Sequence, residues 1–175
     1  MTSPIPAAWR TTYSENRELG IPGQIYGERV FEGITSGWCA TALRAGVGLV
    51  DGVAAEPGEY ALPGAASTAA QFAGVVLHQH GKDDGDDLTA GQLYAANQDF
   101  PLYRKGWVIV RVGQVALVRN GPIYLVIDTA GGDVLGEFRG SADGTNTVRL
   151  DNTRPVRVHI AGAAAGVAVL ELGMP

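Results

Sequence analysis

Short apolar runs separated by glycine, proline and polar turns recur along most of the chain. Apolar and polar positions alternate within many of these runs, which is the period of a half-buried strand. An alanine-rich stretch, 65–70, fits a single helical turn that Ser67 or Thr68 can cap. The expected strands lie at 47–50, 60–62, 72–80, 93–96, 103–118 with a break at Gly113, 123–127, 134–138, 156–160 and 167–172. This spacing predicts a mainly β chain, folded as an antiparallel β-sandwich or a partly closed β-barrel.

The parity of two strands predicts which of their side chains are buried. In 103–118 the valines that follow Trp107 fall on one face, and the other face carries Trp107, Ile109 and Arg111. In 156–160 both valines and Ile160 are expected on a core face, which leaves His159 on the surface or in an interface. The second strand therefore has one face for the core and one for solvent or a partner, and the first has two faces of different composition.

The last strand and a nearby hairpin complete this prediction. In 167–172, Glu171 must reach solvent or a partner, so the side that carries Leu170 is expected to be deeper than the side that carries Val169. The sequence Ala-Gly-Gly-Asp at 130–133 fits a hairpin turn between the strands at 123–127 and 134–138.

Residues 1–28 differ from the rest of the chain because prolines and glycines interrupt scattered apolar residues with no regular period. The segment contains Trp9, Tyr13 and Tyr26, and a disordered tail would normally lack aromatic residues. We therefore expect an extended arm that becomes ordered against a surface. The predicted organisation is an arm over 1–28 and a β-rich domain over 29–175, although an arm folded back on its own domain fits the same pattern. The arm residues expected in an interface with a partner protein or another subunit are Trp9, Arg10, Tyr13, Ile25 and Tyr26.

Composition limits the class of protein. Apolar residues make up 46% of the chain, enough for a buried core, while 25 glycines and 9 prolines argue against long helices. The net charge is −5 with no basic stripe, so we expect no direct nucleic-acid binding and no membrane binding. The single cysteine, Cys39, is expected to be a small buried apolar residue.

Few residues offer chemistry. His78 and His80 share a strand face and precede four aspartates at 83–87, so a calcium or transition-metal site is an alternative to a solvated hairpin tip. The spacing does not match an EF-hand, and we expect no metal, no cofactor and no catalytic residue. Arg104 and Lys105, beside Tyr103 and Trp107, form a small basic-aromatic patch that could meet an acidic surface, although a solvated strand start fits the same residues.

The order of short phrases in the second half of the chain resembles the cement, or head-decoration, proteins of tailed bacteriophages. The phrases are QFAGVVL at 71–77, YRKGWVIVRV at 103–112, GPIYLVID at 121–128, VLGEF at 134–138 and GVAVLEL at 166–172. The resemblance implies a structural protein that binds the outer surface of a capsid and staples neighbouring major capsid proteins against internal DNA pressure. It also implies a homo-oligomer, a trimer in preference to a dimer, made in the host bacterial cytoplasm and located on the virion.

A β-sandwich accessory domain with carbohydrate-binding or hydrolytic activity is the alternative. Such a domain needs a cleft with converging polar groups and aromatic side chains. Aromatic residues make up only 7% of this chain and are dispersed, which favours the structural role.

Overall fold

The computed structural model describes residues 21–26, 33–52, 57–79, 93–130 and 132–173, and nearly all of its regular structure is β-strand. One short 3₁₀ turn, η1 at Ala69–Gln71, precedes a strand as the alanine-rich stretch predicts. The strands are β1 Ile34–Trp38, β2 Leu43–Arg44, β3 Gly48–Asp51, β4 Tyr60–Ala61, β5 Phe72–Val76, β6 Leu93–Tyr94, β7 Asp99–Tyr103, β8 Lys105–Arg111, β9 Tyr124–Val126, β10 Phe138–Arg139, β11 Thr147–Arg149, β12 Val156–Ile160 and β13 Val167–Gly173.

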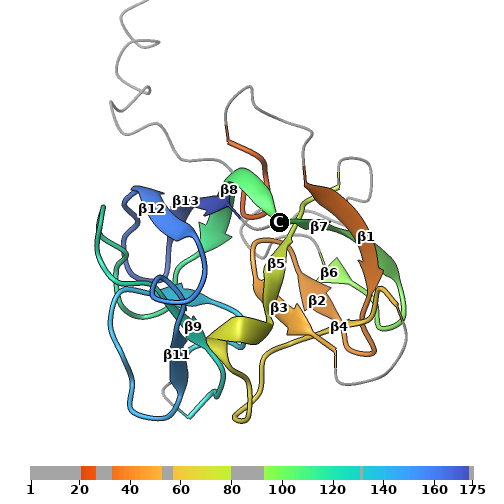
Figure 1. The fold of residues 1–175 in the computed structure, drawn as a ribbon, viewed down its shortest axis with the longest axis horizontal. Coiled ribbons are helices and arrows are strands. Elements are labelled where there is room, and N and C mark those ends of the chain that lie inside the picture. Colours follow the sequence, from red (N-terminus) through yellow and green to blue (C-terminus); the bar gives the residue numbers. More distant parts are fainter. Residues whose placement is uncertain (1–20, 27–32, 53–56, 80–92, 131, 174–175) are drawn as a thin grey trace, which may run out of the picture.

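The strands pair in an antiparallel manner, as expected. A five-stranded sheet has the order β1-β7-β5-β3-β4, and a three-stranded sheet has the order β12-β13-β8. Two smaller sheets have the orders β10-β9-β11 and β2-β6. Figure 1 shows β1–β4 on one side of the molecule and β9–β13 on the other, with β5 near the middle. The curled sheets confirm the mainly β fold in its partly closed form.

Strand β5 lies between two hydrophobic clusters, and all of its residues are buried. Phe72 and Val75 belong to the larger cluster, which also contains the inward side chains of β8, β12 and β13. Ala73 and Val76 belong to the smaller cluster around Tyr94 and Phe100. A Phe72–Phe138 contact, edge to face with centroids 6.1 Å apart, joins the two sides of the molecule. The rigid centre fixes the sheet β12-β13-β8 relative to the five-stranded sheet.

Strand β7 is absent from the sequence prediction because Pro101 lies within it. Proline lacks the N–H that an interior ladder position needs. Here the proline lies where the pairing of β5 with β7 ends, since the last register pair is Val76 with Leu102. The Leu77 N–H still donates to the Pro101 carbonyl oxygen at 2.9 Å. The same ladder end explains why β5 stops at Val76, short of the expected end at residue 80.

The expected strand over 134–138 is wrong. Gly136 has φ +82°, and the Glu137 N–H donates to the Val134 carbonyl oxygen, so the segment is a turn. Only its last residue, Phe138, enters a strand, where it pairs with Leu125. The sheet is completed by β11, which the sequence pattern does not reveal.

A buried ion pair holds this turn. Asp133 Oδ2 accepts from Arg139 Nη1 at 2.6 Å, and Asp133 Oδ1 accepts from the Gln114 N–H at 2.5 Å. The Asp143 carboxylate accepts a second, longer bond from the same Arg139 nitrogen at 3.2 Å. These contacts satisfy charges in a place where unpaired ones would be costly.

Candidate interaction surface

The sheet β12-β13-β8 has one face toward the core and one face away from it, which we call the outer face. The inward side chains are Val108, Val110, Val156, Val158, Ala168, Leu170 and Leu172. Register places Trp107 opposite Glu171, Ile109 opposite Val169 and Arg157 opposite Glu171, so these five residues share the outer face. The alternation predicted for β8 and β13 is therefore confirmed.

Ile160 is an exception to the predicted parity. A register shift between Val158 and Ile160 pairs Ile160 with Val169, an outer-face residue. Ile160 is only half-buried and does not belong to the core cluster. The extra residue of this β-bulge is His159, and bulges turn side chains in directions that simple alternation does not give.

Residues 21–26 run along the free edge of β8. The Tyr26 N–H donates to the Trp107 carbonyl oxygen at 2.9 Å, the Ile109 N–H donates to Gln24, and the Gly23 N–H donates to Ile109. Ile25 forms an isolated antiparallel β-bridge with Val108, and its side chain packs against the core. This part of the predicted arm is hydrogen-bonded to the sheet, and the proposed boundary at residue 28 stays a prediction.

Three rings gather on the outer face, and we call them the ring cluster: Tyr26, Trp107 and His159. Trp107 and His159 stack with centroids 4.0 Å apart and planes at 17°, and Tyr26 lies 6.4 Å from His159. Because β8 and β12 flank β13, the stacked pair spans β13 at the level of Val169 and Glu171. This cover accounts for the complete burial of Val169 on a face that the sequence marks as the shallower one.

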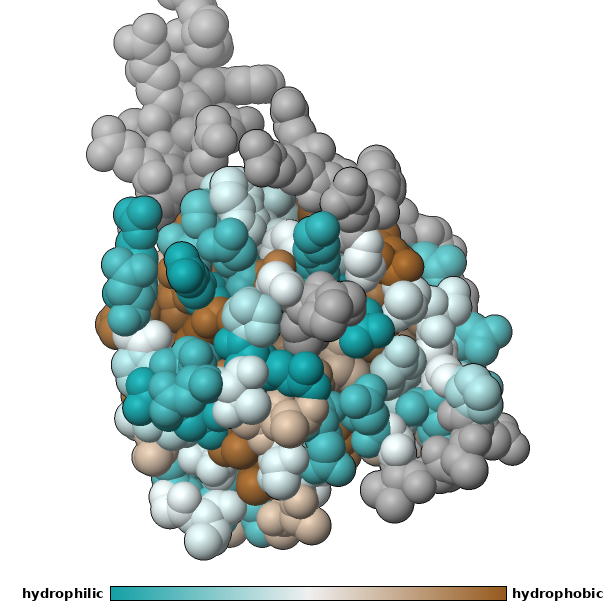
Figure 2. All heavy atoms as spheres, in the orientation of Figure 1, coloured by the Kyte–Doolittle hydropathy of each residue, from teal (hydrophilic) through white to brown (hydrophobic). Residues whose placement is uncertain are grey.

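Charged side chains surround the ring cluster. Lys105, Arg157 and Glu171 are exposed, and Arg157 and Glu171 are direct cross-strand partners. Figure 2 shows a mostly hydrophilic surface, with hydrophobic side chains in small separate areas. Half-buried rings with charges of both signs at their border are typical of the centre of a polar protein–protein interface.

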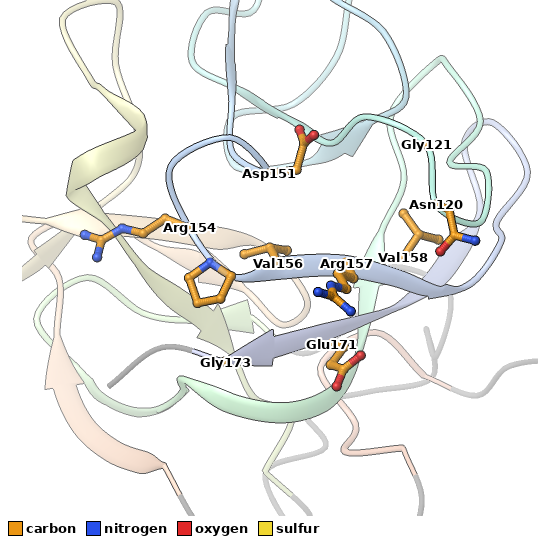
Figure 3. A pocket seen from close by; sticks show the side chains of 10 residues that line it. Asn120, Gly121, Asp151, Arg154, Val156, Arg157, Val158, Glu171 and Gly173 are labelled. Carbon is orange, nitrogen blue, oxygen red and sulfur yellow. The ribbon is translucent and has the colours of Figure 1, made fainter.

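A groove runs beside β12, with a volume of about 610 Å³. Its lining comprises Asn120, Gly121, Asp151, Arg154, Pro155, Val156, Arg157, Val158, Glu171 and Gly173. Figure 3 shows Asp151 on one side of β12 and the side chains of Arg157 and Glu171 on the other. The groove therefore follows the edge of the sheet and adjoins the outer face.

Two of the charged groups in this groove are already engaged. The Arg149 guanidinium, which donates to Asp151 at 2.9 Å, holds the pKa of that carboxyl below its ordinary value. Arg154 donates to the carbonyl oxygens of Ala69 and Ala70. A carboxyl with a lowered pKa is ill suited to act as a general acid, and none of the lining residues is aromatic. The groove thus lacks the features that the carbohydrate-binding or hydrolytic alternative requires.

The structure places the other residues singled out in the sequence as follows. Trp9, Arg10 and Tyr13 lie outside the described residues, as do His80 and Asp83–Asp87. Tyr103 is fully buried, and burial raises its pKa, so its place in the expected basic-aromatic patch is wrong. Arg104 is half-buried with its Nε enclosed, while Lys105 lies on the outer face with Trp107. Cys39 is a buried free thiol, as expected.

Sequence reasoning missed His159 as the partner of Trp107, as well as the groove. The stack depends on strand order and on the β-bulge, neither of which leaves a local signal. Within the described ranges, no cluster of three or more histidine, cysteine or acidic side chains is placed to hold a metal. The same ranges contain no helix with the length and hydropathy of a membrane span.

Comparison with known families decides the class of this protein. Residues 9–173 match the family described as "Structural cement protein (E217 gp24/Pam3 gp6)". The chain belongs to this family of phage cement proteins. A search of curated protein sequences finds no match.

A solved structure supports the fold of this cement-family chain. This chain is similar in fold to a chain from "The capsid of Myoviridae Phage XM1", with a TM-score of 0.69. The two are 14% identical in sequence, and the match covers 93% of this chain and 96% of that one. The sequence resemblance to phage cement proteins is therefore confirmed. The protein is a structural component associated with a phage capsid, and hence with the virion.

Proposed function

We propose that the protein binds the outer surface of a phage capsid and staples neighbouring major capsid proteins. The observation that carries this proposal is membership of the structural cement family over residues 9–173. Internal DNA pressure tends to open the seams between capsid proteins. A protein that contacts both sides of a seam adds buried area there, and many such contacts along one shell act with high avidity.

The outer face supplies a surface suited to this role. Trp107 and Tyr26 combine large apolar area with a polar end, and Lys105 provides a positive charge beside them. Tryptophan, tyrosine and arginine side chains carry much of the energy in protein interfaces, and a charge at the rim steers association. Arm residues Trp9, Arg10 and Tyr13 extend the contact area to neighbouring subunits. Arg104, which directly precedes β8, adds a second basic residue beside Lys105.

We infer a structural role without catalysis, cofactor or direct nucleic-acid contact, and assembly as a homotrimer rather than a dimer. The net charge of −5 opposes binding to phosphate backbones. Synthesis in the host cytoplasm precedes attachment to the shell. Sedimentation analysis of the purified protein measures the oligomer, and a trimer is the expected result.

Binding to particles that lack this protein tests the capsid role. Lys105→Glu should weaken binding by about tenfold, the equivalent of about 1.4 kcal/mol, because it reverses a charge beside the ring cluster. Arg44→Glu is a matched control, since Arg44 is exposed on β2 in the five-stranded half of the molecule. Equal binding by both variants would show that the outer face does not contact the capsid.

The composition of purified particles gives an independent test. A cement protein should be present in a fixed ratio to the major capsid protein, comparable to it in copy number. Quantitative mass spectrometry of intact virions measures that ratio. A few copies per particle would favour an accessory enzyme or a tail component instead.

A further inference from the structure

Strand β12 forms an edge of its sheet, and its register shows which backbone groups point outward. The Gly173 N–H donates to the Pro155 carbonyl oxygen at 2.9 Å, which makes residues 155 and 173 a hydrogen-bonded pair. In an antiparallel ladder such pairs alternate with non-hydrogen-bonded ones. Arg157 with Glu171 is therefore the next bonded pair, while Val156 and Val158 direct their N–H and C=O groups away from β13.

The outward groups of β12 are largely unpaired. The Val156 N–H donates to Arg154 of the preceding turn. Neither backbone group of Val158 has a hydrogen-bond partner among the described residues, and the groove lies directly beside them. An edge strand with free donors and acceptors in an open groove is the geometry that accepts an added strand.

The opposite edge of the same sheet is already occupied. Residues 21–26 hydrogen-bond to β8 through Ile109 and Trp107, so the order across the sheet is 21–26, β8, β13, β12. The N-terminal segment thus joins the sheet at the edge opposite the groove. A segment that starts at one edge of one copy and pairs with the other edge of the next copy makes a head-to-tail contact, and such contacts form a ring when the rotation between copies closes.

We propose that residues 7–19 of a neighbouring copy add a strand to the free edge of β12, in the groove. This run is free of glycine and proline, and it contains Trp9, Thr11 and Tyr13, which are residue types that favour strands. It carries Arg10 and Arg17 together with Glu15 and Glu18, charges of both signs.

The groove matches this occupant in charge and in reach. Arg157 and Glu171 present opposite charges at its wall, which suits a mixed-charge strand better than a partner of one sign. Twenty residues precede Ile21, and they can span up to about 65 Å when extended, enough to reach an adjacent copy. The inference rests on the proposed self-association and assigns it a specific contact, between residues 7–19 of one copy and β12 of the next.

Disulfide capture between two variants tests the exchange without any capsid. One protein carries Thr12→Cys in the arm, and the other carries Arg157→Cys beside the groove. The matched control pairs Thr12→Cys with Arg44→Cys, an exposed arginine on β2. Buried Cys39 is present in every sample, so its background is common to all. Thr11→Cys and Ser14→Cys repeat the measurement in adjacent registers.

We expect cross-linked dimers at Arg157→Cys to exceed the control at least fivefold for one of the three arm positions. If each of the three arm cysteines gives the same yield of cross-linked dimer with Arg157→Cys as with Arg44→Cys, the proposal is wrong. Cross-links that form only within one chain, seen in the double variant Thr12→Cys/Arg157→Cys, would also overturn it. Capsid binding measured separately remains informative, because a protein that binds particles yet fails this capture refutes only the strand exchange.

Hydrogen exchange gives a second readout on the unaltered protein. The Val158 amide has no acceptor among the described residues, so it should exchange rapidly in an isolated copy. In the assembled protein an added strand supplies an acceptor, and exchange at this amide should slow by at least tenfold relative to the dilute monomer. Rapid exchange at Val158 in the assembly would rule out the added strand.

Discussion

His159 stacks on Trp107 across an intervening strand, with ring centroids 4.0 Å apart and planes at 17°. The two residues come from β12 and β8, which are not neighbours in the sheet because β13 lies between them. Their rings therefore bridge over β13 and cover Val169. This relationship gives the outer face a rigid, half-exposed centre at the place where we propose that the capsid binds.

Removing one ring should destabilise the fold. His159→Ala ends the stack and exposes part of Val169, so we expect a loss of about 1 kcal/mol in unfolding free energy, the scale of an aromatic pair. Denaturant titration measures it. His159→Phe keeps a flat ring and should retain most of the stability. If the alanine variant unfolds at the wild-type denaturant concentration, the stack contributes nothing to the fold.

Charge placed in the terminal strand should separate its two faces. Leu170 lies in the main core, so Leu170→Asp should abolish soluble expression because an unpaired buried charge is rarely tolerated. Val169 is equally buried, but under the half-buried ring cluster and outside the core clusters, so Val169→Asp should fold with a much lower melting temperature. Exposed Glu171→Ala provides a neutral control on the same strand. Equal tolerance of both aspartates would mean that β13 is not packed within the sheet.

Two truncations should distinguish the arm from the sheet. Deleting residues 1–20 should leave a folded protein that assembles or attaches less well. Deleting 1–28 also removes the backbone bonds to Trp107 and Ile109 and the packing of Ile25, at a further cost of several kcal/mol. Thermal melting and sedimentation of the two proteins measure both effects. Unfolding of the shorter deletion would place residues 1–20 in the core and refute the arm.

The strands with clear alternation were predictable nearly to the residue. Val156–Ile160 appears as expected, and the last strand extends only one residue beyond its predicted end. In both, alternate apolar residues face the core, in β12 as far as the bulge, so local pattern and tertiary packing agree there. The apolar run at 134–138 misled because Gly136 adopts a conformation that turns the chain, and sequence pattern does not report φ.

The surface was less predictable than the strands. Parity correctly separated Trp107 and Ile109 from the valines of β8. The partner of Trp107 could not be predicted, because it depends on strand order and on a bulge that also moves Ile160 off the core face. Backbone bonds hold residues 21–26 to β8, and backbone bonds leave no signature in side-chain pattern.

The buried ion pair of Asp133 with Arg139 should be sensitive to loss of one partner. Asp133→Ala leaves the arginine charge buried and frees the Gln114 N–H, so we expect a loss of about 3–5 kcal/mol. Arg149→Ala breaks an exposed pair instead and should cost much less. Denaturant unfolding compares the two. Similar small losses would show that the buried pair is replaced by water or by Asp143.

Glu137 should make the protein less stable as pH rises. Burial raises the pKa of Glu137 above its ordinary value, and nearby Asp133 raises it further, against a lowering bond from the Val134 N–H. A carboxyl with a raised folded-state pKa favours folding below its unfolded pKa, and that contribution is lost as pH rises through the folded pKa. Glu137→Gln removes the ionisation and keeps an oxygen that can accept from Val134.

The variant should therefore melt at a higher temperature than wild type at pH 7, and the difference should shrink as pH falls toward 4. Melting curves across this range measure the effect, with Glu171→Gln as the exposed control that should show no such trend. The opposite slope, with the largest gain at pH 4, would mean that the ionised carboxylate stabilises the turn. In that case the hydrogen bond from Val134 outweighs the cost of burying the charge.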